Sequence, residues 1–136
     1  MTSSTHMFSA DELATLLDEA NHAPWESVRA ALATIDGQPH PRVGWLTGHL
    51  TATKRDYWTQ IAAATNTPAP DDAAGLTRLM AWEVDATRAL NAEALQTRLT
   101  HSDESITVSE VLRLNARHTV WHAGQIAALA NPTRLA

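Results

Sequence analysis

The sequence predicts an all-α fold, a four-helix bundle whose first helix is interrupted. Three observations support this prediction. Apolar residues recur at helical spacing through most of the chain, two capping boxes mark helix starts, and no segment alternates in the manner of a strand. The chain has 136 residues, the size of one ordinary domain, so we expect a single domain over residues 1–136.

A capping box at Ser9 to Glu12 predicts the start of the first helix, because serine can accept a backbone N–H while glutamate reaches back. Apolar side chains follow at helical spacing, at Leu13, Leu16, Leu17 and Ala20. Pro24 disfavours a helical residue before it, so we expect a break at residues 21–23. Pro24 also suits the first position of a second helical piece, which would end at Gly37 and carry Trp25, Val28, Leu32 and Ile35.

Turn-forming segments bound the next two helices. The stretch GQPHPR precedes an apolar stripe that runs from Val43 to about Ala64, and TNTPAPDD ends it. A third helix is expected to begin near Asp71 and to run through Leu99.

HSDES is expected to be a short connector before the last helix. A second capping box, Thr107 to Glu110, marks the start of that helix, and Asn131 followed by Pro132 marks its end. The face of this helix that should enter the core carries both apolar and polar residues: Val108, Val111, Asn115, His118, His122, Ile126 and Leu129. Polar groups buried without partners cost roughly 1 to 3 kcal/mol each, so something must satisfy them.

Composition and charge exclude several functional classes. With 15 acidic and 10 basic residues the formal charge is -5, which disfavours nucleic acids and anionic membrane surfaces as partners. The absence of cysteine removes disulfides, thiolate ligands and a cysteine nucleophile. No segment predicts a signal peptide or a membrane span, so we expect a cytoplasmic protein. Five tryptophans beside one tyrosine and one phenylalanine should mostly anchor the core.

Two histidines on the last helix suggest a metal site. His118 and His122 are four residues apart, a spacing that places side chains about 6 Å apart on one face of a helix. Both imidazoles could reach one cation, with Gln125 at the edge of the site. His49, at the edge of the second apolar stripe, could add a third imidazole, and three ligands would leave a position open as in catalytic sites. The alternative is that these are core histidines bonded to neighbouring side chains.

Two further polar residues are candidate site residues. Asn115 lies one turn before His118 and could orient a ligand or a bound water, or bond to a helix neighbour. Glu83 on the third helix is the best carboxylate candidate for a general base or a fourth ligand, although charged residues often edge a core stripe. Trp45 and Trp121 are expected to pack away from the ligands, since adjacent residues on a helix point about 100° apart.

The segment VGWLTGHL, together with a last helix that ends NARHTVWHAGQIAAL, resembles the DinB/YfiT superfamily of metal-dependent four-helix bundles, over nearly the whole chain. The resemblance implies a metal site at His49, His118 and His122, and a homodimer. The superfamily includes thiol-dependent S-transferases that act with bacillithiol or mycothiol. In the related mycothiol-dependent isomerases a glutamate occupies the position of His118 and an additional domain contributes to the site, so that isomerase activity is not expected here.

These observations predict a divalent-metal-dependent enzyme that acts on a small molecule, either a thiol-dependent S-transferase or a hydrolase. Zinc is the first expectation for the metal, and nickel, iron, manganese or copper are alternatives. The competing hypothesis is a non-catalytic, stress-associated metal-binding protein with the same triad. Ligand count distinguishes them, because three protein ligands leave an open position while a fourth, such as Glu83, would close the site.

Overall fold

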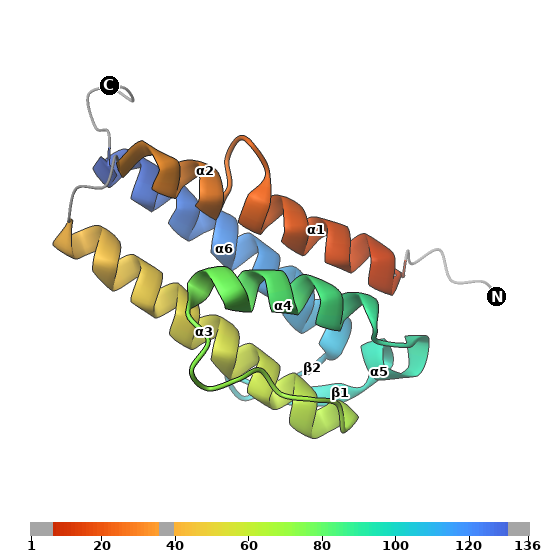
Figure 1. Ribbon diagram of the computed structural model, residues 1–136. Helices are drawn as coiled ribbons and strands as arrows, with labels where there is room; N and C mark the ends of the chain where they lie inside the picture. The colour runs from red at the N-terminus through yellow and green to blue at the C-terminus, as the bar shows by residue number, and fades with distance from the viewer. Residues whose placement is uncertain (1–6, 36–39, 131–136) are drawn as a thin grey trace.

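The computed structural model describes residues 7–35 and 40–130, which form a mostly helical fold with one small two-stranded sheet (Figure 1). The elements, in chain order, are α1 (Ala10–His22), α2 (Val28–Leu32), the 3₁₀ helix η1 (Ala33–Ile35), α3 (Pro41–Thr65), α4 (Leu76–Arg88), α5 (Ala92–Gln96), β1 (Arg98–His101), β2 (Glu104–Thr107) and α6 (Val108–Ala130). The helical prediction is therefore correct for most of the described chain. None of the described helices is long and apolar enough to cross a membrane.

Both predicted capping boxes are present. The Ser9 hydroxyl accepts the Glu12 N–H at 3.1 Å, and the Glu12 carboxylate accepts the Ser9 N–H at 2.9 Å. At the start of α6, the Thr107 hydroxyl and the Glu110 carboxylate exchange the same pair of bonds, at 3.1 and 3.2 Å. These bonds satisfy backbone donors that have no partner within the helix. The predicted helix ends at Gly37 and at residues 131–132 lie outside the described residues.

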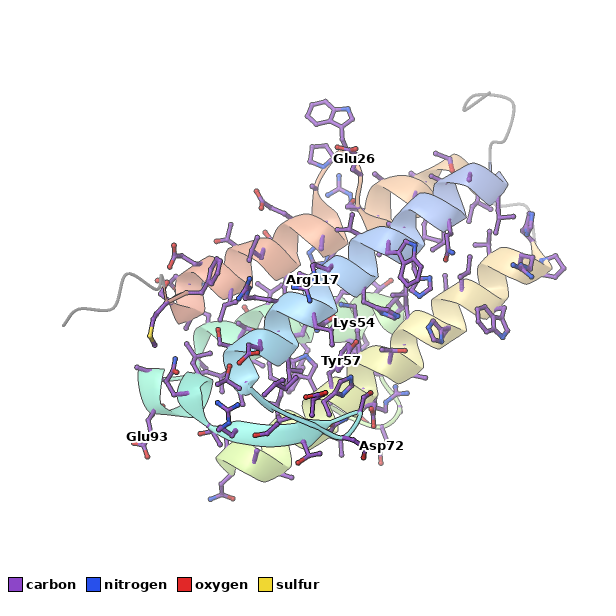
Figure 2. All side chains as sticks on the ribbon, turned by 180° about the vertical axis from the view of Figure 1, so that it is seen from behind. Glu26, Lys54, Tyr57, Asp72, Glu93 and Arg117 are labelled. Carbon is purple, nitrogen blue, oxygen red and sulfur yellow. The ribbon has the colours of Figure 1, made fainter. Side chains whose placement is uncertain are left out.

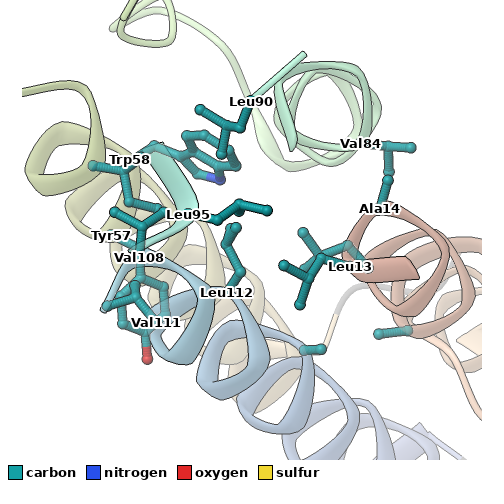
Figure 3. Packing of buried hydrophobic residues seen from close by; sticks show 14 residues of the cluster. Leu13, Ala14, Tyr57, Trp58, Val84, Leu90, Leu95, Val108, Val111 and Leu112 are labelled. Carbon is teal, nitrogen blue, oxygen red and sulfur yellow. The ribbon is translucent and has the colours of Figure 1, made fainter. Parts of the chain in front are cut away.

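The two longest helices, α3 and α6, run antiparallel and form two cores between them. The second half of α3 packs with the first half of α6, α1, α4 and α5 in a cluster that includes Leu13, Leu17, Trp58, Ile61, Val108 and Leu112 (Figure 3). The first half of α3 packs with the second half of α6 and with α2 in a cluster that includes Val28, Leu46, Leu50, Met80, Ala123 and Ile126. The middle of both helices therefore lies between two apolar clusters.

The segment after α3 differs from the prediction of one helix over residues 71–99. The side chain of Asp71 accepts the Ala73 N–H at 2.9 Å and forms a turn, so that α4 begins only after Gly75. At the other end, the Asn91 side chain accepts the Ala94 N–H at 2.8 Å as the N-cap of α5. A side chain that bonds to the backbone in this way competes with continuation of the preceding helix.

The expectation of a simple connector at HSDES was wrong, because residues 98–107 form a β-hairpin. Strands β1 and β2 pair antiparallel, with His101 opposite Glu104. Ser102 and Asp103 between them have φ angles of 49° and 67°, the left-handed conformation that tight two-residue hairpin turns require. The hairpin brings the His101 ring within 5.5 Å of the Tyr57 ring on α3.

Helix α2 begins later than predicted from Pro24. Ser27 is its N-cap and accepts the Ala30 N–H at 3.1 Å, which is a stronger start signal than a proline at the first position. Trp25 is consequently left in the loop before α2, where 77% of its surface is exposed. The expectation that most tryptophans anchor the core was also wrong, since Trp45 and Trp121 are exposed as well and Trp58 is the fully buried one.

Candidate metal centre

Helix α6 places His118 and His122 one turn apart, with their Nε2 atoms 3.0 Å from each other. The Nδ1 atom of His122 lies 2.6 Å from the Gln125 side-chain oxygen. Because an amide oxygen can only accept, the proton of the neutral ring is on Nδ1 and the Nε2 lone pair faces His118. Two imidazole nitrogens at this separation share either a proton or a cation.

Helix α3 adds the third imidazole. Leu46 and Leu50 are buried in the core shared with α6, and they hold the half-buried His49 against that helix. Its ring centroid lies 5.3 Å from that of His118 and 4.8 Å from that of His122. One nitrogen from each of the three rings lies within 4.8 Å of the others. The structure thus brings together the three histidines that the sequence singled out, which we call the triad.

The donor atoms of the triad fit a transition metal. Two nitrogens bound to one tetrahedral zinc at about 2.0 Å lie roughly 3.3 Å apart, close to the 3.0 Å between His118 and His122. Within the described residues, this group of potential ligands contains three histidines and no carboxylate. The group can therefore hold a divalent cation and leave at least one coordination position for another molecule.

The surroundings of His118 keep its imidazole neutral. Burial, together with smaller electrostatic effects of His122, His49 and Lys54, lowers the pKa of His118 from its ordinary 6.5 to about 4. A neutral imidazole carries a lone pair, and only this form binds a metal. His118 is therefore ready to act as a ligand at neutral pH.

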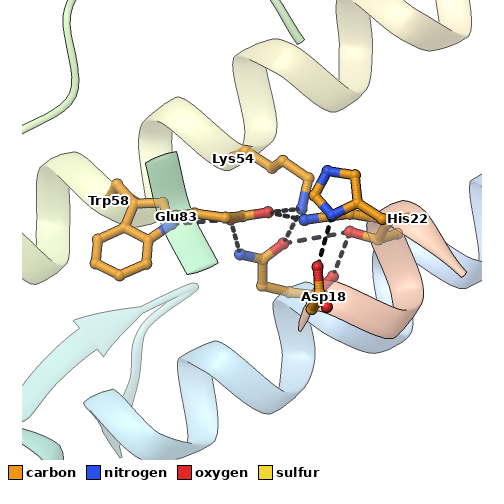
Figure 4. A network of polar contacts seen from close by, with 8 residues as sticks. Asp18, His22, Lys54, Trp58 and Glu83 are labelled. Carbon is orange, nitrogen blue, oxygen red and sulfur yellow. Dashed lines mark hydrogen bonds and ion pairs between the residues drawn. The ribbon is translucent and has the colours of Figure 1, made fainter. Parts of the chain in front are cut away.

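A buried polar network connects four helices beside the triad (Figure 4). The Glu83 carboxylate on α4 accepts from Lys54 at 2.5 Å and Trp58 at 2.9 Å, both on α3. It also accepts from Asn21 of α1 at 2.7 Å and from Asn115 of α6 at 2.8 Å. Each carboxylate oxygen receives two hydrogen bonds, which is the full capacity of the group.

This network accounts for both polar residues that the sequence offered as further site candidates. With four donors on its two oxygens, Glu83 has no acceptor position left for a cation, and the group of potential ligands does not include it. The side chain of Asn115 donates to Glu83 and accepts from Lys54 at 2.9 Å. Asn115 therefore bonds to neighbouring helices rather than to the triad.

Lys54 is the residue that the sequence analysis missed. It is the only lysine of the chain, and only 1% of it is exposed. It lies on α3, as does Tyr57 (Figure 2), and its ammonium group reaches Glu83 of α4 and Asn115 of α6. Burial lowers the pKa of Lys54, while the carboxylate of Glu83 acts in the opposite direction. The available signal was its position one turn after Leu50, on the apolar stripe of α3.

Aromatic side chains surround the triad, contrary to the expectation that Trp45 and Trp121 pack away from it. The Trp45 ring is stacked on His49 at a centroid distance of 5.2 Å and an interplanar angle of 3°. The Trp121 ring lies on His122 at 5.4 Å and 22°. Trp45 precedes His49 by four residues, so both share one face of the helix; this spacing, and not adjacency, decides the contact.

A cavity of about 680 Å³ lies on another side of α6, between this helix and α1. Its lining includes Leu16, Trp25, Arg117, Val120 and Trp121, but none of the three histidines. Trp121 is thus at the edge of both the cavity and the triad.

Comparisons with protein-family models, with curated proteins and with solved structures find no match to this chain.

Proposed function

We propose that this chain is a divalent-metal-dependent enzyme that acts on a small molecule, as a thiol-dependent S-transferase or a hydrolase. The observation that carries the proposal is the convergence of three imidazole nitrogens, from α3 and α6, to within 4.8 Å of one another. Zinc is the metal we expect first, because it accepts three imidazoles together with one exchangeable ligand. The DinB/YfiT resemblance supports the same assignment, and the packing of α1, α3, α4 and α6 supports that family's four-helix bundle.

Each residue of the site has a defined task in this proposal. His49, His118 and His122 bind the metal, which when present lowers the pKa of a bound water or thiol toward neutrality. The Gln125 side-chain oxygen accepts a hydrogen bond from the Nδ1–H of His122 and so keeps the Nε2 lone pair directed at the site. Trp45 and Trp121 stack on the rings of His49 and His122 and help to hold them in place.

The ligand count favours an enzyme over a purely structural metal site. Structural zinc sites have four protein ligands, whereas catalytic sites have three and keep a position for water or substrate. The group found among the described residues has three members, and Glu83 is engaged elsewhere. The homodimer and the small-molecule substrate are parts of the same proposal, and light scattering on the purified chain tests the first of them.

Elemental analysis tests the metal centre. The protein is purified without chelators or a metal-affinity column, beside a His118→Ala/His122→Ala variant and a His22→Ala control, since His22 pairs with Asp18 at 2.8 Å on α1. We expect about one equivalent of a transition metal per chain in the parent and the control, and its loss in the double variant. A parent that is empty and cannot be loaded with zinc, nickel or iron would refute the proposal.

Activity is then tested on the metal-loaded protein with bacillithiol or mycothiol and a panel of electrophiles, and with a panel of esters and amides without thiol. Turnover that is lost in the His118→Ala/His122→Ala variant supports the transferase or the hydrolase, according to the panel. A loaded protein that turns over neither panel and binds no thiol supports the non-catalytic metal-binding protein instead.

A further inference from the structure

Three aromatic side chains lie against the triad. Trp45 is stacked on His49 and Trp121 on His122, as described above, and the Tyr57 ring meets His118 edge to face at 6.4 Å. The chain has five tryptophans and one tyrosine, so two of the tryptophans and the only tyrosine gather at this one site. Aromatic residues are therefore concentrated around the triad.

The two indoles are more exposed than protection of the histidines requires. Of the side-chain surface, 62% is exposed for Trp45 and 66% for Trp121. Each indole uses one face against an imidazole, and most of its remaining surface is in contact with water. Removal of this apolar indole surface from water is favourable. A flat apolar ligand that covered the indoles would therefore gain binding free energy.

The charge of the site determines whether it attracts an anionic or a cationic ligand. The imidazoles are neutral ligands, and no carboxylate belongs to the group of potential ligands among the described residues. A divalent metal held there keeps its full charge of +2, because the nearby Lys54 and Glu83 neutralise each other as an ion pair. An anionic donor is therefore attracted to the open position, and a cationic aromatic molecule is repelled.

We propose that the triad, Trp45 and Trp121 form a binding site for planar aromatic molecules that carry one anionic oxygen donor, such as an aryl carboxylate or a phenolate. The oxygen occupies the open position of the metal, and the ring stacks against the indoles. The inference rests on the proposed metal centre and names the class of molecule that it takes as substrate.

Cobalt-loaded protein offers a direct test, because the visible d–d absorption of Co²⁺ changes when a donor enters its coordination sphere. The dissociation constants of 2-naphthoate and of decahydro-2-naphthoate are measured by titration of this absorption. The two ions have the same charge and the same type of donor group, and they differ mainly in the planarity and aromaticity of the rings. We expect 2-naphthoate to bind about threefold to tenfold more tightly, the range expected for one or two aromatic contacts.

Variants locate the origin of this preference. In the Trp45→Leu/Trp121→Leu variant the ratio of the two dissociation constants should approach one. In the Trp45→Phe/Trp121→Phe variant most of the preference for 2-naphthoate should be restored. Trp25→Leu is the matched control. Trp25 is also exposed, at 77%, and none of the ring contacts found among the described residues joins it to the triad. Exposed positions tolerate such changes, and circular dichroism checks that each variant is folded.

The outcomes separate this inference from the proposed function. If both carboxylates change the cobalt spectrum with equal dissociation constants, or if the ratio persists in the double leucine variant, the aromatic site is refuted while the open metal centre stands. If the protein takes up no cobalt, or if neither carboxylate changes its spectrum, the open metal centre is refuted and the inference with it. If the leucine variants only lose cobalt affinity and keep the ratio, the indoles protect the histidines and bind no substrate.

Discussion

Replacement of Glu83 by glutamine removes the carboxylate that faces the buried ammonium group of Lys54 at 2.5 Å. Glutamine has almost the same shape, so the change affects charge and hydrogen bonding rather than packing. Its amide NH₂ group would face donors of Asn21, Lys54, Trp58 or Asn115, where the carboxylate accepted. Loss of one partner of a buried ion pair costs about 3–5 kcal/mol, a large part of the roughly 5–15 kcal/mol by which a domain is stable. We expect the melting temperature to fall by about 10–20 °C.

The stability of the variant should also rise with pH more strongly than that of the parent. Burial already lowers the pKa of Lys54, and the loss of Glu83 removes the charge that opposed this effect. Lys54 would then be neutral in the folded chain but protonated in the unfolded chain below its ordinary pKa of 10.5. Since the unfolded state binds the additional proton, the stability of the variant rises with pH up to 10.5, by as much as about 1.4 kcal/mol per unit.

Urea unfolding of parent and variant, followed by circular dichroism between pH 7 and about 9.5, measures both effects, since tyrosine titrates only near pH 10. Glu93→Gln is the control, because Glu93 is exposed on α5 and its change should alter stability by less than about 0.5 kcal/mol. A Glu83→Gln protein that is as stable as the parent at pH 7 would refute the account of the buried network. If the unfolding free energy of the variant does not rise with pH more than that of the parent, the prediction that Lys54 is neutral in the folded variant is refuted.

Gln125→Leu should weaken zinc binding by about 10-fold to 100-fold with little change in stability, because His122 loses the acceptor that orients it. Competition with a fluorescent chelator measures the zinc affinity, and an unchanged affinity would contradict the role of Gln125. In metal-free protein the folded pKa of His118, about 4, lies below its ordinary value of 6.5, so unfolded chains bind more protons between these values and stability should fall as the pH drops from 6.5 to 4. Unfolding of parent and His118→Asn at both ends of this range checks it, and an equal slope in the variant would assign the effect to other groups. An amine-acylating reagent should leave Lys54 unmodified in folded protein and modify it in urea, as peptide mapping by mass spectrometry will show; rapid labelling of the folded chain would contradict its burial.

The parts of the site that the sequence predicted depend on local spacing. His118 and His122 share a helix face because they are four residues apart, whatever the rest of the chain does. The same rule applies to Trp45 and His49, and it would have predicted their stacking if it had been used in place of adjacency. The capping boxes at Ser9 and Thr107 are equally local, since each involves residues within one turn.

The buried network could not be predicted in this way, because its members are far apart in the chain. Glu83 is 29 residues from Lys54, 62 from Asn21 and 32 from Asn115. Which polar residues meet depends on how the helices pack, and helical spacing alone carries no information about that. A single lysine on an apolar stripe could have indicated that a buried partner exists, but not which residue it is.

The late start of α2 and the hairpin have a different cause. In both places a short polar side chain or a left-handed turn competes with helix formation, at Ser27 and at Ser102 and Asp103. The difference in energy between such local alternatives is small, and contacts with the long helices decide between them. The hairpin, for example, contacts both α3 and α6.

All three nitrogen donors come from α3 and α6, two helices that meet above and below the triad in separate apolar clusters. The remaining elements contribute to the surroundings of the triad but supply none of its ligands. The hairpin, which carries His101 beside Tyr57, and the loop before α2 could therefore be exchanged or lengthened without a change in the separation of the three nitrogens. In a redesign of this chain, the lengths of the hairpin and of the loop before α2 can be varied separately from the geometry of metal binding.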